Sequence, residues 1–121
     1  MRLRITLELK HQANQLTIIP FDYQRKISAW IYHILSRNDA DYAEWLHNKG
    51  YQSENRFYKY FTFSELFLPK KQVLKDVGLH VQGHTIALQL SFAATDIEYN
   101  FISGLFQDVE LQLSHKQGQV N

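Results

Sequence analysis

The chain has 121 residues, of which 45% are hydrophobic and 21% charged, a formal net charge of +1 and a sequence pI near 8.0. This composition is typical of a globular protein and argues against intrinsic disorder, and the length suits one domain with one hydrophobic core over residues 1–121. The absence of cysteine excludes disulfides and thiolate chemistry. No apolar run approaches the roughly 18 residues of a membrane helix, and the alternating charges of residues 1–10 are unlike a signal peptide, so we expect a cytoplasmic protein.

Two strands and a helix are predicted in the first part of the chain. Residues 2–10 alternate between polar side chains and apolar ones at positions 3, 5, 7 and 9, which is the period of a half-buried strand. A short strand at residues 16–19 ends at Pro20, because proline cannot donate to a sheet. Asp22 is placed to cap the helix that follows. The apolar face of that helix comprises Ile27, Trp30, Ile31, Ile34 and Leu35.

A second, shorter helix and an aromatic strand come next. Asp39 is placed to cap this helix, and Gly50 fits the left-handed residue just past its end, so His47 falls in the last turn. Residues 51–55 are polar and are predicted to form a loop. Residues 56–67 are predicted to form one strand, with Lys59 among its phenylalanines on one side and two tyrosines on the other. The phenylalanines expected to share that side are Phe57, Phe61, Phe63 and Phe67.

The last third of the chain predicts two strands, a helix and a final strand. Residues 73–81 are predicted as a strand, and Gln82 and Gly83 as a two-residue hairpin turn into a strand at residues 85–92. Thr95 and Glu98 have the spacing of a capping box, which marks the start of a helix. Residues 109–113 alternate as the final strand. The apolar face of the helix comprises Ile97, Phe101, Ile102 and Leu105.

The order of these elements predicts the fold class. It is the split βαβ plan of an α+β, ferredoxin-like (RRM-like) βαββαβ sandwich, with an antiparallel sheet, helices on one face and an extra short helix after the first. Such a fold hosts many functions and does not by itself select one. The apolar positions expected to form its core are Leu3, Ile5, Leu7, Trp30, Ile34, Phe61, Leu88, Leu90, Phe101 and Leu105.

Three polar side chains on three predicted elements are candidates for chemistry. Tyr32, His47 and Lys59 bring a phenol, an imidazole and an ammonium, which together can donate a proton, accept one and neutralise a developing phosphate charge. Each has a structural alternative: Tyr32 as a core residue, His47 as a cap of helix carbonyls, Lys59 as an edge-strand charge. We interpret the neighbouring His33 as a surface residue.

The residue pattern itself gives only weak indications of metal binding or nucleic-acid binding. His80 and His84 bracket a turn, but no further ligands complete a zinc site, so we expect no metal and no cofactor. The pI lies below the value of about 9 that flags nucleic-acid binding. Basic residues nevertheless cluster locally, and such clusters can form a positive patch.

Four segments in the same order resemble a known family. They are PFDYQRKISAWIYHIL, YAEWLHNKGY, FYKYFTFSELF and DIEYNFISGLF, and they are similar to the amino-terminal domain of the CRISPR-associated endoribonucleases that process precursor CRISPR RNA, the Cas six family. The resemblance spans nearly the whole chain. It implies metal-independent cleavage of repeat RNA, in which a ribose 2′-hydroxyl attacks the adjacent phosphate and leaves a 2′,3′-cyclic phosphate. The family's catalytic tyrosine, histidine and lysine fall on Tyr32, His47 and Lys59.

The resemblance also implies the roles of these three residues and the partners of the protein. His47 would act as general base or acid, Tyr32 as its partner in proton transfer or positioning, and Lys59 as the charge stabiliser. The expected partners are CRISPR repeat RNA and either a second ferredoxin-like domain or a CRISPR effector complex, with a homodimer as a further candidate assembly and no membrane. The side chains expected to bind RNA are Arg25, Lys26, Arg56, Lys70 and Lys71.

The chain departs from the family pattern in one respect, and a second function stays open. Members of the family usually have two such domains and a glycine-rich loop that holds RNA, whereas the five glycines here are dispersed. The 121 residues alone are therefore expected to bind RNA weakly and cleave it slowly or undetectably. The alternative is a non-catalytic ferredoxin-like module that binds RNA or assembles with other proteins.

Overall fold

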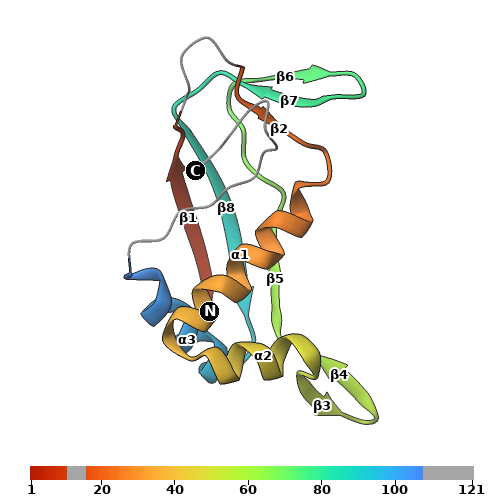
Figure 1. Cartoon of the computed structure of the whole chain (residues 1–121), viewed down its shortest axis with the longest axis vertical. Helices are drawn as coiled ribbons and strands as arrows, with labels where there is room; N and C mark the ends of the chain where they lie inside the picture. Colours follow the sequence, from red (N-terminus) through yellow and green to blue (C-terminus); the bar gives the residue numbers. More distant parts are fainter. Residues whose placement is uncertain (11–15, 108–121) are drawn as a thin grey trace.

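The computed structural model describes residues 1–10 and 16–107 (Figure 1). Within these residues the chain forms three helices and eight strands. Their order is β1 (Arg2–Glu8), β2 (Ile18–Ile19), α1 (Tyr23–Asn38), α2 (Ala40–Asn48), β3 (Tyr51–Ser53), β4 (Arg56–Tyr58), β5 (Phe61–Phe63), β6 (Lys71–Leu74), β7 (Gly78–Val81), β8 (Thr85–Phe92) and α3 (Thr95–Leu105).

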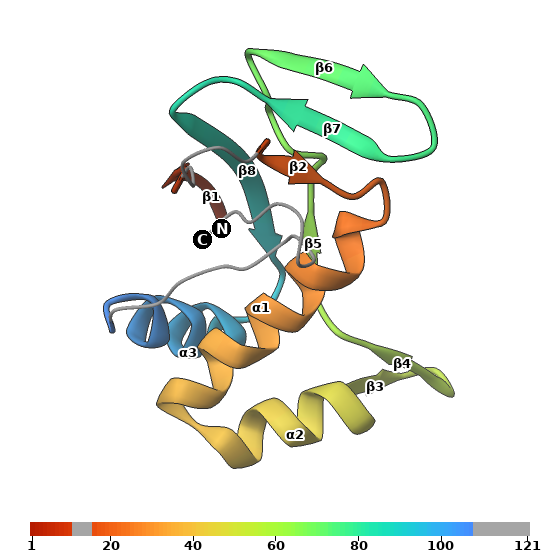
Figure 2. The same cartoon turned by 45° about the horizontal axis from the view of Figure 1, so that its top comes forward.

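The main sheet is antiparallel and has the strand order β1-β8-β5. Its register places Ile5 opposite Leu88 and Phe61 opposite Phe92. A second sheet, β2-β7-β6, lies at one end of the main sheet, and the β3–β4 hairpin extends from the other end (Figures 1 and 2). The predicted fold class is confirmed: this is an α+β ferredoxin-like arrangement with α2 as the extra short helix. The strand predicted at residues 109–113 lies outside the described residues.

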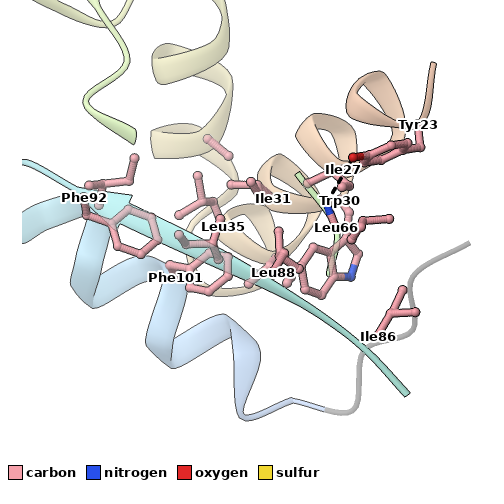
Figure 3. Packing of buried hydrophobic residues seen from close by; sticks show 14 of the residues in the cluster. Tyr23, Ile27, Trp30, Ile31, Leu35, Leu66, Ile86, Leu88, Phe92 and Phe101 are labelled. Carbon is pink, nitrogen blue, oxygen red and sulfur yellow. Dashed lines mark hydrogen bonds between the residues drawn. The ribbon is translucent and has the colours of Figure 1, made fainter. Parts of the chain in front are cut away.

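The hydrophobic core lies between the main sheet and helices α1 and α3 (Figure 3). Five of the ten predicted core residues are buried, namely Trp30, Ile34, Leu88, Leu90 and Phe101. The other five pack against this core while staying partly exposed, namely Leu3, Ile5, Leu7, Phe61 and Leu105. Trp30 meets Phe101 edge to face, with ring centroids 6.4 Å apart, so α1 and α3 share one aromatic contact. Among the described residues, no helix combines the length and apolar character needed to cross a bilayer.

The helix ends follow the sequence in part. The Asp39 side chain accepts a hydrogen bond from the backbone N–H of Tyr42 at 3.0 Å, which confirms the cap of α2. Asp22 is the N-cap residue of α1, but its side chain makes no capping hydrogen bond. The predicted capping box is wrong, because Ala94 is the N-cap of α3 and Thr95 is already helical. Glu98 pairs instead with the amino group of Met1 at 2.9 Å.

The predicted loop at residues 51–55 and the strand at 56–67 are wrong in detail. Residues 51–58 form the β3–β4 hairpin, whose turn residues Glu54 and Asn55 both have positive φ, at 51° and 67°. The aromatic run then breaks at Tyr60, where φ is 58°, and resumes as β5. The four phenylalanines therefore do not share one face, and Phe57 lies exposed on the hairpin. Period-two alternation does not reveal a reversal when both halves of the run alternate.

The predicted strand at residues 73–81 is a hairpin as well. Strands β6 and β7 pair antiparallel around a turn in which Asp76 has a φ of 64°. Gln82 and Gly83 do not form a hairpin turn, because β7 and β8 belong to different sheets. The short segment after β7 carries the chain from the second sheet into the first.

The contact between α1 and α3 depends on Gly104. A Cβ atom at this position would meet the backbone carbonyl oxygen of Ile34. We expect Gly104→Ala to lower the free energy of unfolding by about 1–3 kcal/mol, although alanine is the better helix former, because the two backbones must move apart. Urea denaturation followed by circular dichroism measures the change.

Gly83→Ala is the matched control for this prediction. The atom nearest to a Cβ at Gly83 is the Cβ of Lys70 at 3.9 Å, which is ordinary contact. This variant should stay within about 0.5 kcal/mol of the natural chain. Equal stability of the two variants would contradict the proposed packing of α1 on α3.

Candidate active site

Tyr32 and His47 come together between the middle of α1 and the last turn of α2. Tyr32 lies on α1 beside the buried Ile31, and His47 lies in the last turn of α2. Their ring centroids are 4.8 Å apart and the rings are inclined at 78°, so one ring meets the other edge to face. Phe61 of β5 packs on the other side of the tyrosine, with centroids 5.5 Å apart. Two helices and the main sheet therefore fix the position of the phenol.

The surroundings of Tyr32 set its protonation state. The side chain is half-buried between α1, α2 and β5, and this burial raises the pKa of Tyr32 above its ordinary value of 10. The direction follows from desolvation, which disfavours the charged phenolate. At neutral pH the hydroxyl therefore keeps its proton and acts as a hydrogen-bond or proton donor.

The His47 imidazole is exposed at a groove between α1 and α2. The groove has a volume of about 340 Å³, and His33 and Glu44 also line it. His47 Nδ1 lies 3.3 Å from the side-chain oxygen of Asn48. An amide oxygen is only an acceptor, so this contact favours the tautomer with the proton on Nδ1. In a neutral imidazole with this tautomer the lone pair is on Nε2, where it can accept a proton.

Lys59 has a structural task beside the same pair. Its Nζ donates to the carbonyl oxygens of Leu46 at 2.7 Å and His47 at 2.9 Å. These two residues stand just before Asn48, the last residue of α2. A cation at this end complements both the unpaired carbonyls and the helix dipole. An ammonium has three donors, so one N–H remains for another acceptor. Lys59 thus holds the helix turn that carries His47.

The predicted RNA-binding side chains do not gather around this site. All five are exposed. Arg56 lies on β4, in the hairpin next to the end of α2, whereas Arg25 and Lys26 lie in the first turn of α1. Lys70 and Lys71 lie at the start of β6, at the opposite end of the molecule (Figures 1 and 2). Of the five, only Arg56 lies on the hairpin that follows α2, and it lies next to the turn of that hairpin, opposite Ser53.

Residues 1–10 and 16–107 contain no group of three or more His, Cys, Asp or Glu side chains that could hold a metal ion. His80 lies on β7 opposite Ile18, and His84 lies just before β8. The two histidines that bracket the turn are therefore not part of a larger ligand set in the described chain.

Sequence reasoning missed several members of the site. Phe61 was placed in the core without its contact to Tyr32, and Asn48 gave no signal beyond standing next to His47. It also missed that Tyr42, Trp45 and Tyr51 pack together beside the end of α2. The W-L-H and K-Y-F segments hold the signal, because each pairs a candidate catalytic residue with aromatic neighbours.

The fold and the site together define a class: a ferredoxin-like domain with a tyrosine–histidine pair between its first helix and an extra second helix. The sequence model of the family described as CRISPR-associated protein Cas6, N-terminal (Cas6_I-A), matches residues 18–121. The chain therefore belongs to the Cas6 family of CRISPR-associated proteins.

Relatives agree with this family. The chain is 30% identical over 115 residues to CRISPR-associated endoribonuclease Cas6 1 of Methanocaldococcus jannaschii, which covers 95% of the chain and 42% of that protein. A solved structure of a CRISPR-associated protein Cas6 has a TM-score of 0.57 at 30% identity, over 94% of the chain and 44% of the other. The chain thus spans less than half the length of these relatives.

Two further solved structures support the fold. One is the product of a Cas6-related gene of Pyrococcus furiosus, with a TM-score of 0.69 and 19% identity over 94% of the chain and 43% of the other. The other is an RAMP protein that binds different RNA substrates, with a TM-score of 0.69 and 19% identity over 97% of the chain and 44% of the other.

The cap made by Lys59 predicts a stability effect. Lys59→Met keeps the apolar stem but removes both donors to the end of α2. We expect the free energy of unfolding to fall by about 1–2 kcal/mol, because two carbonyls lose a charged partner. Thermal or urea denaturation measures the loss. Lys49→Met is the control, since Lys49 is exposed and takes no part in these two bonds; equal losses in both variants would contradict the cap.

Proposed function

We propose that this chain is the amino-terminal, catalytic-residue-bearing part of an endoribonuclease that processes CRISPR repeat RNA. One observation carries the proposal: in a member of the Cas6 family, Tyr32 and His47 lie in ring contact at 4.8 Å, and the ammonium of Lys59 is bonded to the His47 carbonyl. An acid, a base and a positive charge at one place are what phosphodiester transfer requires.

The proposed reaction needs no metal ion, because side chains supply each role. His47 Nε2 takes the proton of the ribose 2′-hydroxyl, and the 2′-oxygen forms a bond to the adjacent phosphorus. The bond from phosphorus to the 5′-oxygen of the next nucleotide breaks, and that oxygen receives a proton. The products are a 2′,3′-cyclic phosphate and a free 5′-hydroxyl. The phenol of Tyr32 positions the phosphate or protonates the leaving oxygen, and Lys59 stabilises the charge of the pentavalent phosphate with its remaining N–H.

The proposal includes the domain organisation. Residues 1–121 would form one ferredoxin-like domain, and the family description and the coverage of the Methanocaldococcus jannaschii relative support an amino-terminal part of a longer protein. A second ferredoxin-like domain or an effector complex would supply further phosphate contacts. The cytoplasmic location and the homodimer stay predictions.

A non-catalytic module that binds RNA or assembles with proteins is the second candidate function. The engagement of Lys59 favours it, because two of its three donors already serve helix carbonyls. An exposed His47 with a neighbouring asparagine is also compatible with a surface residue. Cleavage products with cyclic phosphate ends separate the two functions, since a binding module releases none.

His47→Ala tests the proposed base. In the full natural protein that contains this sequence, the variant should cleave repeat RNA about 10²- to 10⁴-fold more slowly with little loss of RNA affinity, which is the usual worth of general acid–base catalysis. Single-turnover cleavage and a binding titration measure the two quantities. His33→Ala is the control, because His33 lines the same groove on α1. Cleavage should also survive a chelator; loss of cleavage with chelator, together with normal cleavage by His47→Ala, would refute the assignment.

A further inference from the structure

Five aromatic side chains form a continuous series beside the end of α2. Tyr58 and Tyr60 stack with centroids 5.7 Å apart and rings inclined at 8°, and Tyr60 stacks on Tyr51 at 4.9 Å and 29°. Tyr51 meets Trp45 edge to face at 5.0 Å, and Trp45 meets Tyr42 at 5.7 Å. We call these residues the aromatic stack. It joins α2 to the β3–β4 hairpin and to the break before β5.

The inner part of the aromatic stack holds the hairpin in place. Tyr42, Tyr51 and Tyr60 are half-buried, and the hydroxyls of Tyr42 and Tyr51 are 2.9 Å apart, within hydrogen-bond distance. Burial is the main cause that raises the pKa of Tyr42, and the hydrogen bond with Tyr51 raises it further. A two-stranded hairpin has little stability in isolation, so these contacts explain why β3 and β4 form.

Tyr58, at the outer end of the aromatic stack, is not needed to hold the hairpin in place. Tyr58 is 40% exposed although its ring lies parallel to that of Tyr60. It pairs with Tyr51 across the hairpin, and alternate residues of a strand share a face, so Arg56 lies on the same face as Tyr58. Phe57 pairs with Gln52 and is 51% exposed on the opposite face. One face of the hairpin therefore ends in a stacked phenol next to a guanidinium.

The backbone at this end is unusual. Tyr60 has a φ of 58°, a backbone conformation that bulky residues rarely adopt. Its carbonyl accepts from the N–H of Ala93 at 2.9 Å, which holds the turn against the main sheet. The two stacked tyrosines flank Lys59, whose ammonium contacts the His47 carbonyl. The outer end of the stack is thus continuous with the candidate active site.

We propose that Tyr58, backed by Tyr60, is a stacking platform for an unpaired nucleobase of the RNA whose scissile phosphate lies at His47. This inference rests on the proposed function. Proteins bind single-stranded RNA by combining aromatic faces with basic side chains along the backbone, and Tyr58 and Arg56 supply one of each on one face. Glu54 in the hairpin turn is exposed as well, so the attraction comes from the stacked ring rather than from net positive charge.

The alternative occupant is a protein, since exposed aromatic residues and arginine also form protein interfaces. The two faces of the hairpin distinguish these occupants. Phe57 is the more exposed and more apolar side chain, so a protein surface that binds the hairpin tip would use it. A nucleobase requires a flat ring with a supporting ring behind it. Tyr58 has such a support in Tyr60, whereas Phe57 makes no ring contact within residues 1–10 and 16–107.

Tyr58→Ala in the full natural protein tests the platform, with short single-stranded RNAs of mixed sequence that carry the fluorescent base 2-aminopurine at successive positions. The natural protein should quench the fluorescence at one position, and Tyr58→Ala should abolish that quenching and weaken binding about 5- to 150-fold, the usual worth of one base–aromatic stack. The ratio should stay constant as salt rises, because stacking releases no counterions. Tyr58→Phe should bind as the natural protein does.

Two controls make the test specific. Phe57→Ala removes an exposed aromatic ring from the other face of the same hairpin and should leave RNA affinity unchanged. Replacing the quenched position by an abasic nucleotide should make the natural protein and Tyr58→Ala bind equally. Equal losses of RNA affinity in Tyr58→Ala and Phe57→Ala would overturn the platform. A loss of affinity in Tyr58→Ala that persists with the abasic RNA would overturn it as well. The same holds if Tyr58→Ala binds RNA normally but changes the assembly of the protein.

The outcome is separable from that of the proposed function. His47→Ala should slow cleavage about 10²- to 10⁴-fold while keeping the quenching at Tyr58. If the RNA is quenched and bound through Tyr58 but never cleaved, the nuclease assignment fails and the platform stands. If His47-dependent cleavage occurs with full affinity in Tyr58→Ala, the platform fails and the nuclease assignment stands.

Discussion

The approach of α3 to α1 decides where the candidate active site lies. Gly104 lets the two backbones come together at Ile34, and the contact is extended by a 2.7 Å hydrogen bond between Asn38 and the buried Asn100. The inner side of α1 packs against α3 and the sheet, and Tyr32 lies against Phe61 of β5 and His47 in the last turn of α2. Only Asp39 separates α1 from α2, so the direction of α2 follows from that of α1, and His47 is brought back to Tyr32.

Charge at both ends then keeps α2 in place. Asp39 accepts from the first turn and Lys59 donates to the last, which is the arrangement that the helix dipole favours. Lys59 therefore stabilises the helix turn that carries His47.

The sequence predicts the elements that depend on local periodicity and caps, such as α1, β8 and the Asp39 cap. It fails where the chain turns inside a predicted strand, as at Tyr60 and Asp76, because one non-glycine residue with positive φ does not interrupt the apolar pattern around it. For the site, Tyr32, His47 and Lys59 came from the resemblance, since fifteen and twelve positions of separation have no fixed geometry. The bond from Lys59 to the end of α2 is tertiary and has no local pattern.

Gly50 lies between the candidate active site and the aromatic stack. It follows α2 with a φ of 85°, and a Cβ there would meet the Tyr58 carbonyl oxygen at 2.7 Å and the Lys59 Cδ at 3.3 Å. The absence of a side chain is thus what lets the end of β4 lie against the end of α2. Any residue that separated them would move the ammonium away from His47 and the Tyr58 ring away from its support. A single close backbone contact therefore sets the distance between the proposed chemistry and the proposed base-stacking platform.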